Sequence, residues 1–131
     1  MRFIGNGGLV VQGEIILPKE GDTLIITKSF KDVLCLLEMG WTAIAPTSET
    51  SFVPDKYFEK QRSRFNKVYL LYDNDTTGQK FSKKFSEQYG IPSLHIPIQY
   101  INDVLVKDIS DYVKANGKDK GVELIKNQIN A

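Results

Sequence analysis

Two carboxylates stand two positions apart in the segment YDNDTTG, residues 72–78, directly after an apolar stretch. In an extended backbone, side chains two residues apart point the same way, so Asp73 and Asp75 can be directed to one place. Carboxylates this close repel each other unless a cation or a proton lies between them. Mg²⁺ binds carboxylate oxygens and keeps positions open for phosphate and water. The pair therefore suggests a metal site; the alternative is that Asp75 caps the next helix and Asp73 ends a strand in solvent.

A second polar group ends another apolar stretch, in TLIITKSFKDVL, residues 23–34. Lys28 and Ser29 follow the apolar residues directly, and Asp32 comes one helical turn later. Ser29 is a typical N-cap for the helix that begins there. An ordinary strand-to-helix turn and the edge of an active site are thus both open from the residues alone.

Further charged residues follow later in the chain. Lys80, Lys83 and Lys84 lie opposite the aromatic stripe of a predicted helix, where they form either a solvated face or a set of phosphate contacts. The segment KDISD, residues 107–111, begins with a lysine and places Asp108 at the start of a short helix. Asp108 is expected either to cap that helix or to join the other carboxylates.

The elements that must position these residues alternate between strands and helices. Short apolar stretches bounded by Gly, Pro or polar residues predict strands, and apolar residues at helical spacing predict helices. The predicted strands are 23–27, 41–46, 67–73 and 92–98. The predicted helices are 30–39, about 55–65, 75–90, 107–117 and 118–130. This order predicts an α/β fold of about four mainly parallel strands, whose carboxyl ends share the edge where ligands bind.

Single positions within these elements carry further expectations. Phe30, Val33, Leu34 and Leu37 share one face of the first helix, so all four are expected to pack against the sheet. His95 lies among apolar residues of the last predicted strand and is expected to be a core residue. The chain has one cysteine and one histidine, which are too few for a zinc site.

The amino-terminal part differs from the rest of the chain. Residues 1–20 are predicted to form a β-hairpin extension with strands at Leu9–Gln12 and Glu14–Leu17. This extension is either an edge hairpin or the end of a preceding domain. Residues 21–131 are predicted to form one domain that closes with the two carboxyl-terminal helices.

Composition limits the classes of partner. The 131 residues include 41% hydrophobic residues, and 17 basic residues nearly balance 16 acidic ones. A net charge of +1 gives no general attraction to nucleic acid or membrane, so any binding to polyanions must come from local clusters. A single cysteine cannot form a disulfide within the chain, which suits a reducing cytoplasm. No apolar stretch is long enough to cross a bilayer, and no membrane partner is expected.

In order and position, these motifs resemble the Toprim domain of DnaG-type bacterial primases and phage primase–helicases. That family has a strand ending in Glu-Gly, an Asp four residues past the Glu, and a later strand ending in Asp-x-Asp with a Gly shortly after. Asp32 takes the place of the first Asp, Asp73 and Asp75 match the metal-binding pair, and Gly78 matches the glycine. The resemblance covers roughly residues 23–126.

The resemblance implies a function in DNA replication. Mg²⁺ or Mn²⁺ would be bound by Asp73 and Asp75, with Asp32 and Asp108 close enough to help. The domain would join nucleoside triphosphates into RNA primers on a single-stranded DNA template, together with a replicative or fused helicase. The location implied is the cytoplasm of a bacterial cell, with a phage or prophage as a source of the gene.

The chain departs from the family where Lys28 and Ser29 replace Glu-Gly. Lys28 could bind phosphate as a point charge, Glu49 on the neighbouring strand's carboxyl end could supply the missing carboxylate, or the site has lost catalysis and kept binding. The catalytic candidates are therefore Glu49, Lys28 and Asp73. The candidates for binding phosphate or nucleic acid are Lys28, Ser29, Lys80, Lys84 and Lys107.

Two other functions stay open at this point. Toprim domains also occur in metal-dependent nucleases, which would cut nucleic acid without added nucleotides. A degenerate, non-catalytic module that binds nucleic acid would fit Lys28. Primases of this type also use a zinc-binding domain and a basic subdomain, so the 131 residues alone are expected to bind metal and to make little or no primer.

Overall fold

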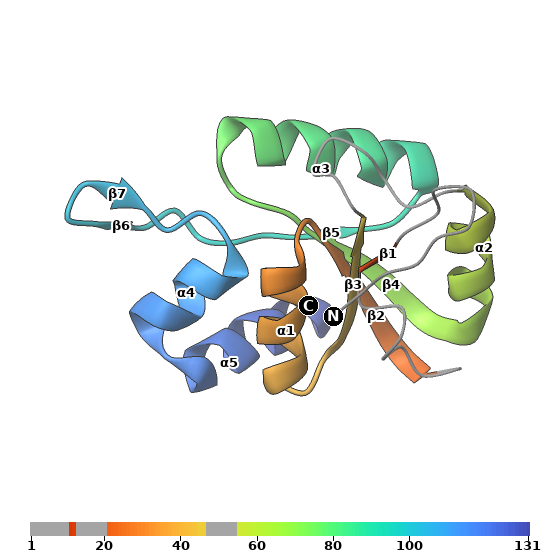
Figure 1. Ribbon diagram of the computed structural model, residues 1–131, viewed down its shortest axis with the longest axis horizontal. Coiled ribbons are helices and arrows are strands. Elements are labelled where there is room, and N and C mark those ends of the chain that lie inside the picture. The colour runs from red at the N-terminus through yellow and green to blue at the C-terminus, as the bar shows by residue number, and fades with distance from the viewer. Residues whose placement is uncertain (1–10, 13–20, 47–54) are drawn as a thin grey trace.

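The computed structural model describes residues 11–12, 21–46 and 55–131, and these form an α/β fold with helices on both faces of a sheet (Figure 1). The strands are β1 (Val11–Gln12), β2 (Gly21–Thr27), β3 (Thr42–Pro46), β4 (Phe65–Leu71), β5 (Ser93–Leu94), β6 (Tyr100–Ile101) and β7 (Val104–Leu105). The helices are α1 (Phe30–Glu38), α2 (Asp55–Arg64), α3 (Thr76–Tyr89), α4 (Ile109–Asn116) and α5 (Lys118–Ile129). The predicted fold class is confirmed.

The main sheet has the order β1-β3-β2-β4-β5. β3, β2, β4 and β5 run parallel, and β1 pairs antiparallel with β3 at the edge. In the register, Ile25 of β2 lies between Ala43 of β3 and Tyr69 of β4. Leu24, Ile25 and Ile26 are fully buried, as expected for a central parallel strand that is covered on both faces.

Alternate residues of the central strands divide between two cores. Leu24 and Ile26 pack with residues of α2 and α3, including Phe58 and Phe85. Ile25 packs on the opposite face with side chains of α1, α4 and α5. Figure 1 shows the resulting three layers, with α3 and α2 on one side of the sheet and α1, α4 and α5 on the other. Because the helices enclose the strands, polar groups gather at the strand ends.

The prediction that Leu34 and His95 lie in the core is wrong for both residues. Leu34 is 46% exposed, because the buried face of α1 is centred on Val33 and Leu36 and turns Leu34 away from the sheet. His95 is exposed, since side chains alternate along this extended segment and the neighbours Leu94 and Ile96 take the inward positions.

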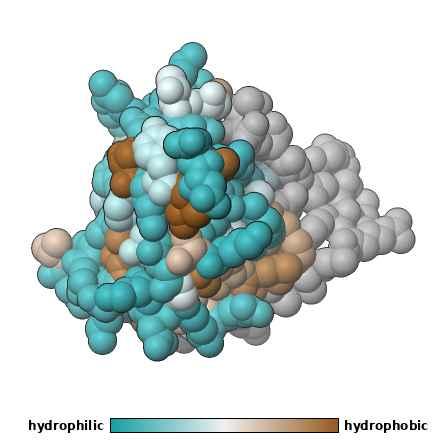
Figure 2. Space-filling view, turned by 90° about the vertical axis from the view of Figure 1, so that its left-hand side faces the viewer, coloured by the Kyte–Doolittle hydropathy of each residue, from teal (hydrophilic) through white to brown (hydrophobic). Residues whose placement is uncertain are grey.

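The predicted strand 92–98 is paired only at β5, and the chain then forms a β-hairpin that sequence reasoning treated as a loop. Asn102 and Asp103 both have positive φ angles, 50° and 64°, as a two-residue turn of this kind requires. The hairpin projects from the body of the molecule (Figure 1). Figure 2 looks at this end of the molecule and shows apolar side chains among hydrophilic ones; Ile98 and Val104 are 64% and 67% exposed.

Of the predicted amino-terminal hairpin, only Val11–Gln12 is described, as β1, and the rest of residues 1–20 lies outside the described residues. Within the described ranges, no helix combines the length and apolar character needed to cross a membrane.

A candidate metal site at the carboxyl edge of the sheet

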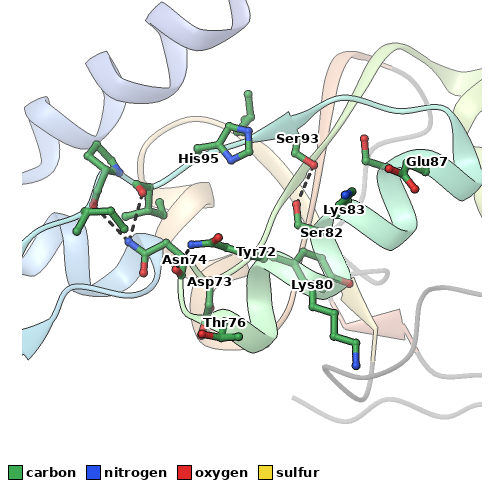
Figure 3. A pocket seen from close by; sticks show the side chains of 16 residues that line it. Tyr72, Asp73, Asn74, Thr76, Lys80, Ser82, Lys83, Glu87, Ser93 and His95 are labelled. Carbon is green, nitrogen blue, oxygen red and sulfur yellow. Dashed lines mark hydrogen bonds between the residues drawn. The ribbon is translucent and has the colours of Figure 1, made fainter.

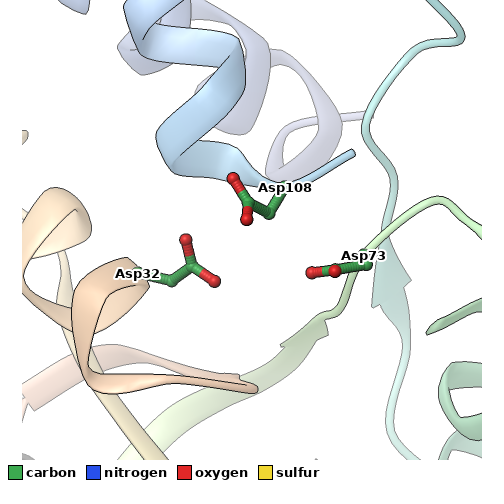
Figure 4. A group of neighbouring side chains, drawn as sticks. All are labelled: Asp32, Asp73 and Asp108. Atoms are coloured by element: carbon green, nitrogen blue, oxygen red, sulfur yellow. The ribbon is translucent and has the colours of Figure 1, made fainter. Parts of the chain in front are cut away.

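Three buried carboxylates meet at the carboxyl edge of the sheet (Figure 4). Asp32 comes from the first turn of α1, Asp73 follows β4, and Asp108 precedes α4. Ligand oxygens of all three lie within 4.8 Å of one another, and the residues are only 1%, 6% and 2% exposed. We call these three residues the carboxylate cluster. Parallel strands explain the meeting point, because β2 and β4 are neighbours that end at the same edge.

Local hydrogen bonds hold Asp32 in this position. Ser29 caps α1, and its hydroxyl accepts a hydrogen bond from the Asp32 backbone N–H at 3.3 Å. The same hydroxyl donates to Asp32 Oδ2 at 3.1 Å, and the Ser110 hydroxyl donates to Asp32 Oδ1 at 2.6 Å. Ser110, which sequence reasoning did not select, therefore connects α4 to α1 at the cluster.

Asp108 has two contacts of a different kind. Its side chain caps α4 by accepting a hydrogen bond from the Asp111 N–H at 2.7 Å. Lys31 Nζ lies 3.2 Å from Asp108 Oδ2, but the Lys31 side chain is 62% exposed. Asp108 thus does both things that the sequence left open: it caps its helix and joins the cluster.

Asp73 is the least satisfied member of the cluster. Lys28 Nζ lies 2.9 Å from Asp73 Oδ2. The other oxygen, Oδ1, is buried and accepts no hydrogen bond within the described part of the chain. The pKa of Asp73 is raised to about 6, chiefly by burial; the charges of Asp108 and Asp32 add to the rise, and the hydrogen bond and charge of Lys28 oppose it. Burial also raises the pKa of Asp32.

These residues fit a divalent cation. A buried carboxylate oxygen without a partner is costly unless a cation or a donor compensates it. Within residues 21–46 and 55–131, Asp73 Oδ1 is such an atom. Among the described residues, three carboxylates face two ammonium groups, so one negative charge remains. Oxygen ligands of this kind suit Mg²⁺ or Mn²⁺.

Asp75 lies outside the carboxylate cluster. Its side chain caps α3 and accepts a hydrogen bond from the Gly78 N–H at 2.7 Å. Together with Lys28, Asp73 and Lys107, it lines a cavity of about 150 Å³ beside the cluster. The structure therefore brings Asp73 together with Asp32 and Asp108, and it leaves Asp75 at the rim.

The lysines of α3 lie on the surface, as the solvated-face interpretation predicts. Lys80 and Lys83 border a groove of about 860 Å³ between α3 and residues 93–98, which starts at Asp73 (Figure 3). Lys84 lies instead over the rings of Phe81 and Phe85, at 5.8 and 5.7 Å from their centroids. Glu49, the proposed replacement carboxylate, lies outside the described residues.

Asn74 lies between the two aspartates of the Asp-x-Asp motif and was not among the site residues predicted from the sequence. It is 7% exposed, and its side-chain amide donates to the backbone carbonyls of Ile96, Pro97 and Val106 at 3.3, 3.3 and 3.0 Å. Its N–H donates to the Lys107 carbonyl at 2.8 Å. Asn74 thereby connects the end of β4 to the segments on either side of the hairpin. Its bond to Lys107 holds the residue next to Asp108 close to β4.

The raised pKa of Asp73 gives a prediction for metal binding. Mn²⁺ and a proton compete for this carboxylate, and its pKa of about 6 means that protonation dominates below that pH. Mn²⁺ is therefore expected to bind about tenfold more weakly at pH 5 than at pH 7. Calorimetric titration across this range measures the effect; an affinity independent of pH would exclude Asp73 as a ligand.

With this geometry in view, comparison with known proteins identifies the family. The profile of the Toprim-like family matches residues 25–113, which include the whole carboxylate cluster. The chain belongs to the Toprim-like family.

The chain is similar in sequence to one DNA primase and similar in fold to two primase structures. The DNA primase of Clostridium acetobutylicum is 29% identical over 110 residues, which are 83% of this chain and 18% of that protein. The primase fragment of the bacteriophage T7 primase-helicase protein has a TM-score of 0.59 at 16% identity and covers 88% of this chain and 47% of that one. The Aquifex aeolicus primase, with its zinc binding and RNA polymerase domains, has a TM-score of 0.63 at 22% identity and covers 94% and 30%.

These comparisons support the predicted resemblance and the fold. The chain is a Toprim domain like that of DNA primases. It spans about one fifth of the length of the curated relative, 18%, and at most half of either solved structure.

Proposed function

We propose that this Toprim domain is the catalytic domain of a phage-type DNA primase, which makes RNA primers on single-stranded DNA by metal-dependent nucleotidyl transfer. The observation that carries this proposal is the carboxylate cluster, in which three buried aspartates leave Asp73 Oδ1 without a partner among the described residues. The similarity to the DNA primase of Clostridium acetobutylicum supports the choice of reaction.

Asp32, Asp73 and Asp108 would hold Mg²⁺ or Mn²⁺, with Asp75 at the rim. When bound, such an ion would stabilise the negative charge that develops on the transferred phosphoryl group. The residues of this chain orient the ligands: Ser29 and Ser110 hold Asp32, and the α4 backbone holds Asp108.

Phosphates of the incoming nucleoside triphosphate would enter beside the carboxylate cluster. The cavity there carries Lys28 and Lys107, which supply positive charge for phosphate oxygens. Lys80 lines the adjoining groove and would contact the nucleic-acid backbone, whereas Lys84 is directed over two aromatic rings. Ser29 uses its hydroxyl within the protein, so its contribution is to fix Asp32.

The partners of this function would be a single-stranded DNA template, nucleoside triphosphates and a replicative or fused helicase. A bacterial cytoplasm would be its location, with phage or prophage origin. The primase fragment of the bacteriophage T7 primase-helicase protein has a similar fold.

A chimera of the related Clostridium acetobutylicum primase, carrying this chain in place of its matching segment, tests the reaction. With Mn²⁺, nucleoside triphosphates and single-stranded DNA, the chimera is expected to make primers. The Glu49→Ala variant is expected to reduce synthesis by more than about 100-fold if Glu49 supplies the carboxylate that Lys28 replaces. Unchanged synthesis and unchanged Mn²⁺ affinity in Glu49→Ala would end the idea of an exchange of roles.

Assays of the chain by itself distinguish the two other candidate functions, a nuclease and a binding module without catalysis. Cutting of DNA or RNA with Mn²⁺ and no added nucleotides would indicate a nuclease. A binding module without catalysis is the second candidate, favoured by the contact of Lys28 with Asp73 at 2.9 Å. Absence of Mn²⁺ binding at millimolar concentration, with Asp73→Asn making no difference, would support that candidate.

A further inference from the structure

Lys28 directs its charge into the carboxylate cluster. Its side chain is 17% exposed, and its ammonium nitrogen lies 2.9 Å from Asp73 Oδ2. Asp32 and Asp108 each have an oxygen within 4.8 Å of an Asp73 oxygen. The ammonium group therefore forms an ion pair at the carboxylate cluster. A lysine of the solvated surface would have none of these contacts.

The two oxygens of Asp73 have different surroundings. Oδ2 is paired with Lys28, while Oδ1 is buried without a partner among the described residues. Asp32 and Asp108 both have an oxygen within 4.8 Å of Asp73. One oxygen of the Asp73 carboxylate thus already has a cation as its partner, and the other oxygen has none among the described residues.

We propose that the Lys28 ammonium group is a built-in counter-ion of Asp73, which occupies one cation position and limits this site to a single divalent ion. Asp73, Asp32 and Asp108 would hold that ion. Two-metal sites bring their ions about 3.5–4 Å apart around shared carboxylates. A fixed ammonium group on Oδ2 repels a second ion at that distance. Lys28 therefore sets the number and the affinity of the bound ions, and this inference rests on the proposed metal site.

Calorimetric titration of the chain with Mn²⁺ at pH 8 tests the proposal. The wild-type chain is expected to bind one ion. Lys28→Met keeps the aliphatic part of the side chain but removes its charge, and it is expected to bind Mn²⁺ at least about tenfold more tightly, a change of about 1.4 kcal/mol. Lys28→Gln, which keeps a polar end, is expected to show the same direction of change.

Lys107→Met is the matched control. Lys107 lines the same cavity as Lys28, but it is exposed and makes no ion pair with the cluster in the described structure. Removing its screened charge is expected to change the Mn²⁺ affinity by less than about threefold. An equal gain in Lys107→Met and Lys28→Met would show a general charge effect and would overturn the role of Lys28.

The outcomes separate the inference from the proposed function. Wild-type binding of two ions, or Lys28 variants that bind no more tightly, would overturn the inference and leave the metal site intact. Absence of Mn²⁺ binding in the wild type and all variants would overturn both. If circular dichroism shows that Lys28→Met does not fold, the number of ions bound by the wild type and the Mn²⁺ affinity of Lys28→Gln still test the role of Lys28.

Discussion

Replacing Asp73 by Asn is expected to weaken Mn²⁺ binding by more than about 100-fold, since even the outer partners of metal ligands contribute about 10–100-fold. Asp73 provides an oxygen that has no partner in the part of the chain that the structure describes, and it approaches both other carboxylates. An amide in its place has no negative charge and offers one weak oxygen ligand. The same substitution is expected to abolish primer synthesis in the chimeric primase.

The metal-free Asp73→Asn chain is expected to be more stable than the wild type. Burial raises the pKa of Asp73 to about 6 in the folded state, from 3.8 in the unfolded chain. The folded state therefore binds this proton more tightly, and the associated stability is complete below pH 3.8 and lost as the pH rises through about 6. At pH 8 the neutral Asn avoids this cost, and we expect a gain of about 1–3 kcal/mol in the free energy of unfolding.

Urea unfolding in EDTA, repeated at pH 4.5 and pH 8, measures this difference. The two chains should differ least at the acidic pH, where the wild-type carboxyl is protonated. A loss of stability at pH 8 would mean that the pair between Lys28 and Asp73 stabilises the fold more than burial of the carboxylate destabilises it. Asp111→Asn, at a partly exposed position in α4, serves as a control for removing an acidic charge.

Substitution of Gly78 by Ala is expected to have the second large effect. Gly78 lies in the first turn of α3, and a Cβ atom there would collide with the backbone oxygen of Asp73 and lie 2.7 Å from its carbonyl carbon and its Cβ. The backbone cannot yield as a flexible side chain would. We expect a loss of about 2–4 kcal/mol in the free energy of unfolding and at least about tenfold weaker Mn²⁺ binding, because Asp73 must move.

Gly90→Ala is the control that separates a loss of stability from a loss of Mn²⁺ affinity. Gly90 ends the same helix with a φ of 68°, and a Cβ atom there would contact nothing within 4 Å. Its substitution is expected to cost about 1 kcal/mol through backbone strain and to leave Mn²⁺ affinity unchanged. If Gly78→Ala also left Mn²⁺ affinity unchanged, the close approach of α3 would have a purely structural role.

Several features of the fold could be predicted because they depend on neighbours in the sequence. Apolar stretches separated by helical patterns predicted the parallel strands and helices, and Gly90 was correctly assigned as the end of α3. The stripe of Phe81, Phe85 and Tyr89 does pack against one core. The hairpin at residues 100–105 was missed, although its Asn-Asp turn between apolar pairs was visible.

The positions of Leu34 and His95 depended on more than periodicity. Both residues lie beside buried neighbours, and a rotation of one position along the helix or the strand decides which side chain faces the sheet. The apolar spacing indicated that each segment has a buried face. Which residues form that face was decided by the packing of α1 on β3 and by the place where β5 ends.

The sequence by itself determined that Asp73 would stand at the carboxyl edge of a parallel sheet near Lys28 and Asp32, because each follows a predicted strand. Only the tertiary structure decided its partners. Asp75, two residues away, is held by the α3 backbone as an N-cap, while Asp108, which is far along the chain, is brought in by the packing of α4 on α1. Strand periodicity fixes side-chain direction over a few residues, but long-range packing and competition for helix caps determine which carboxylates share a charge.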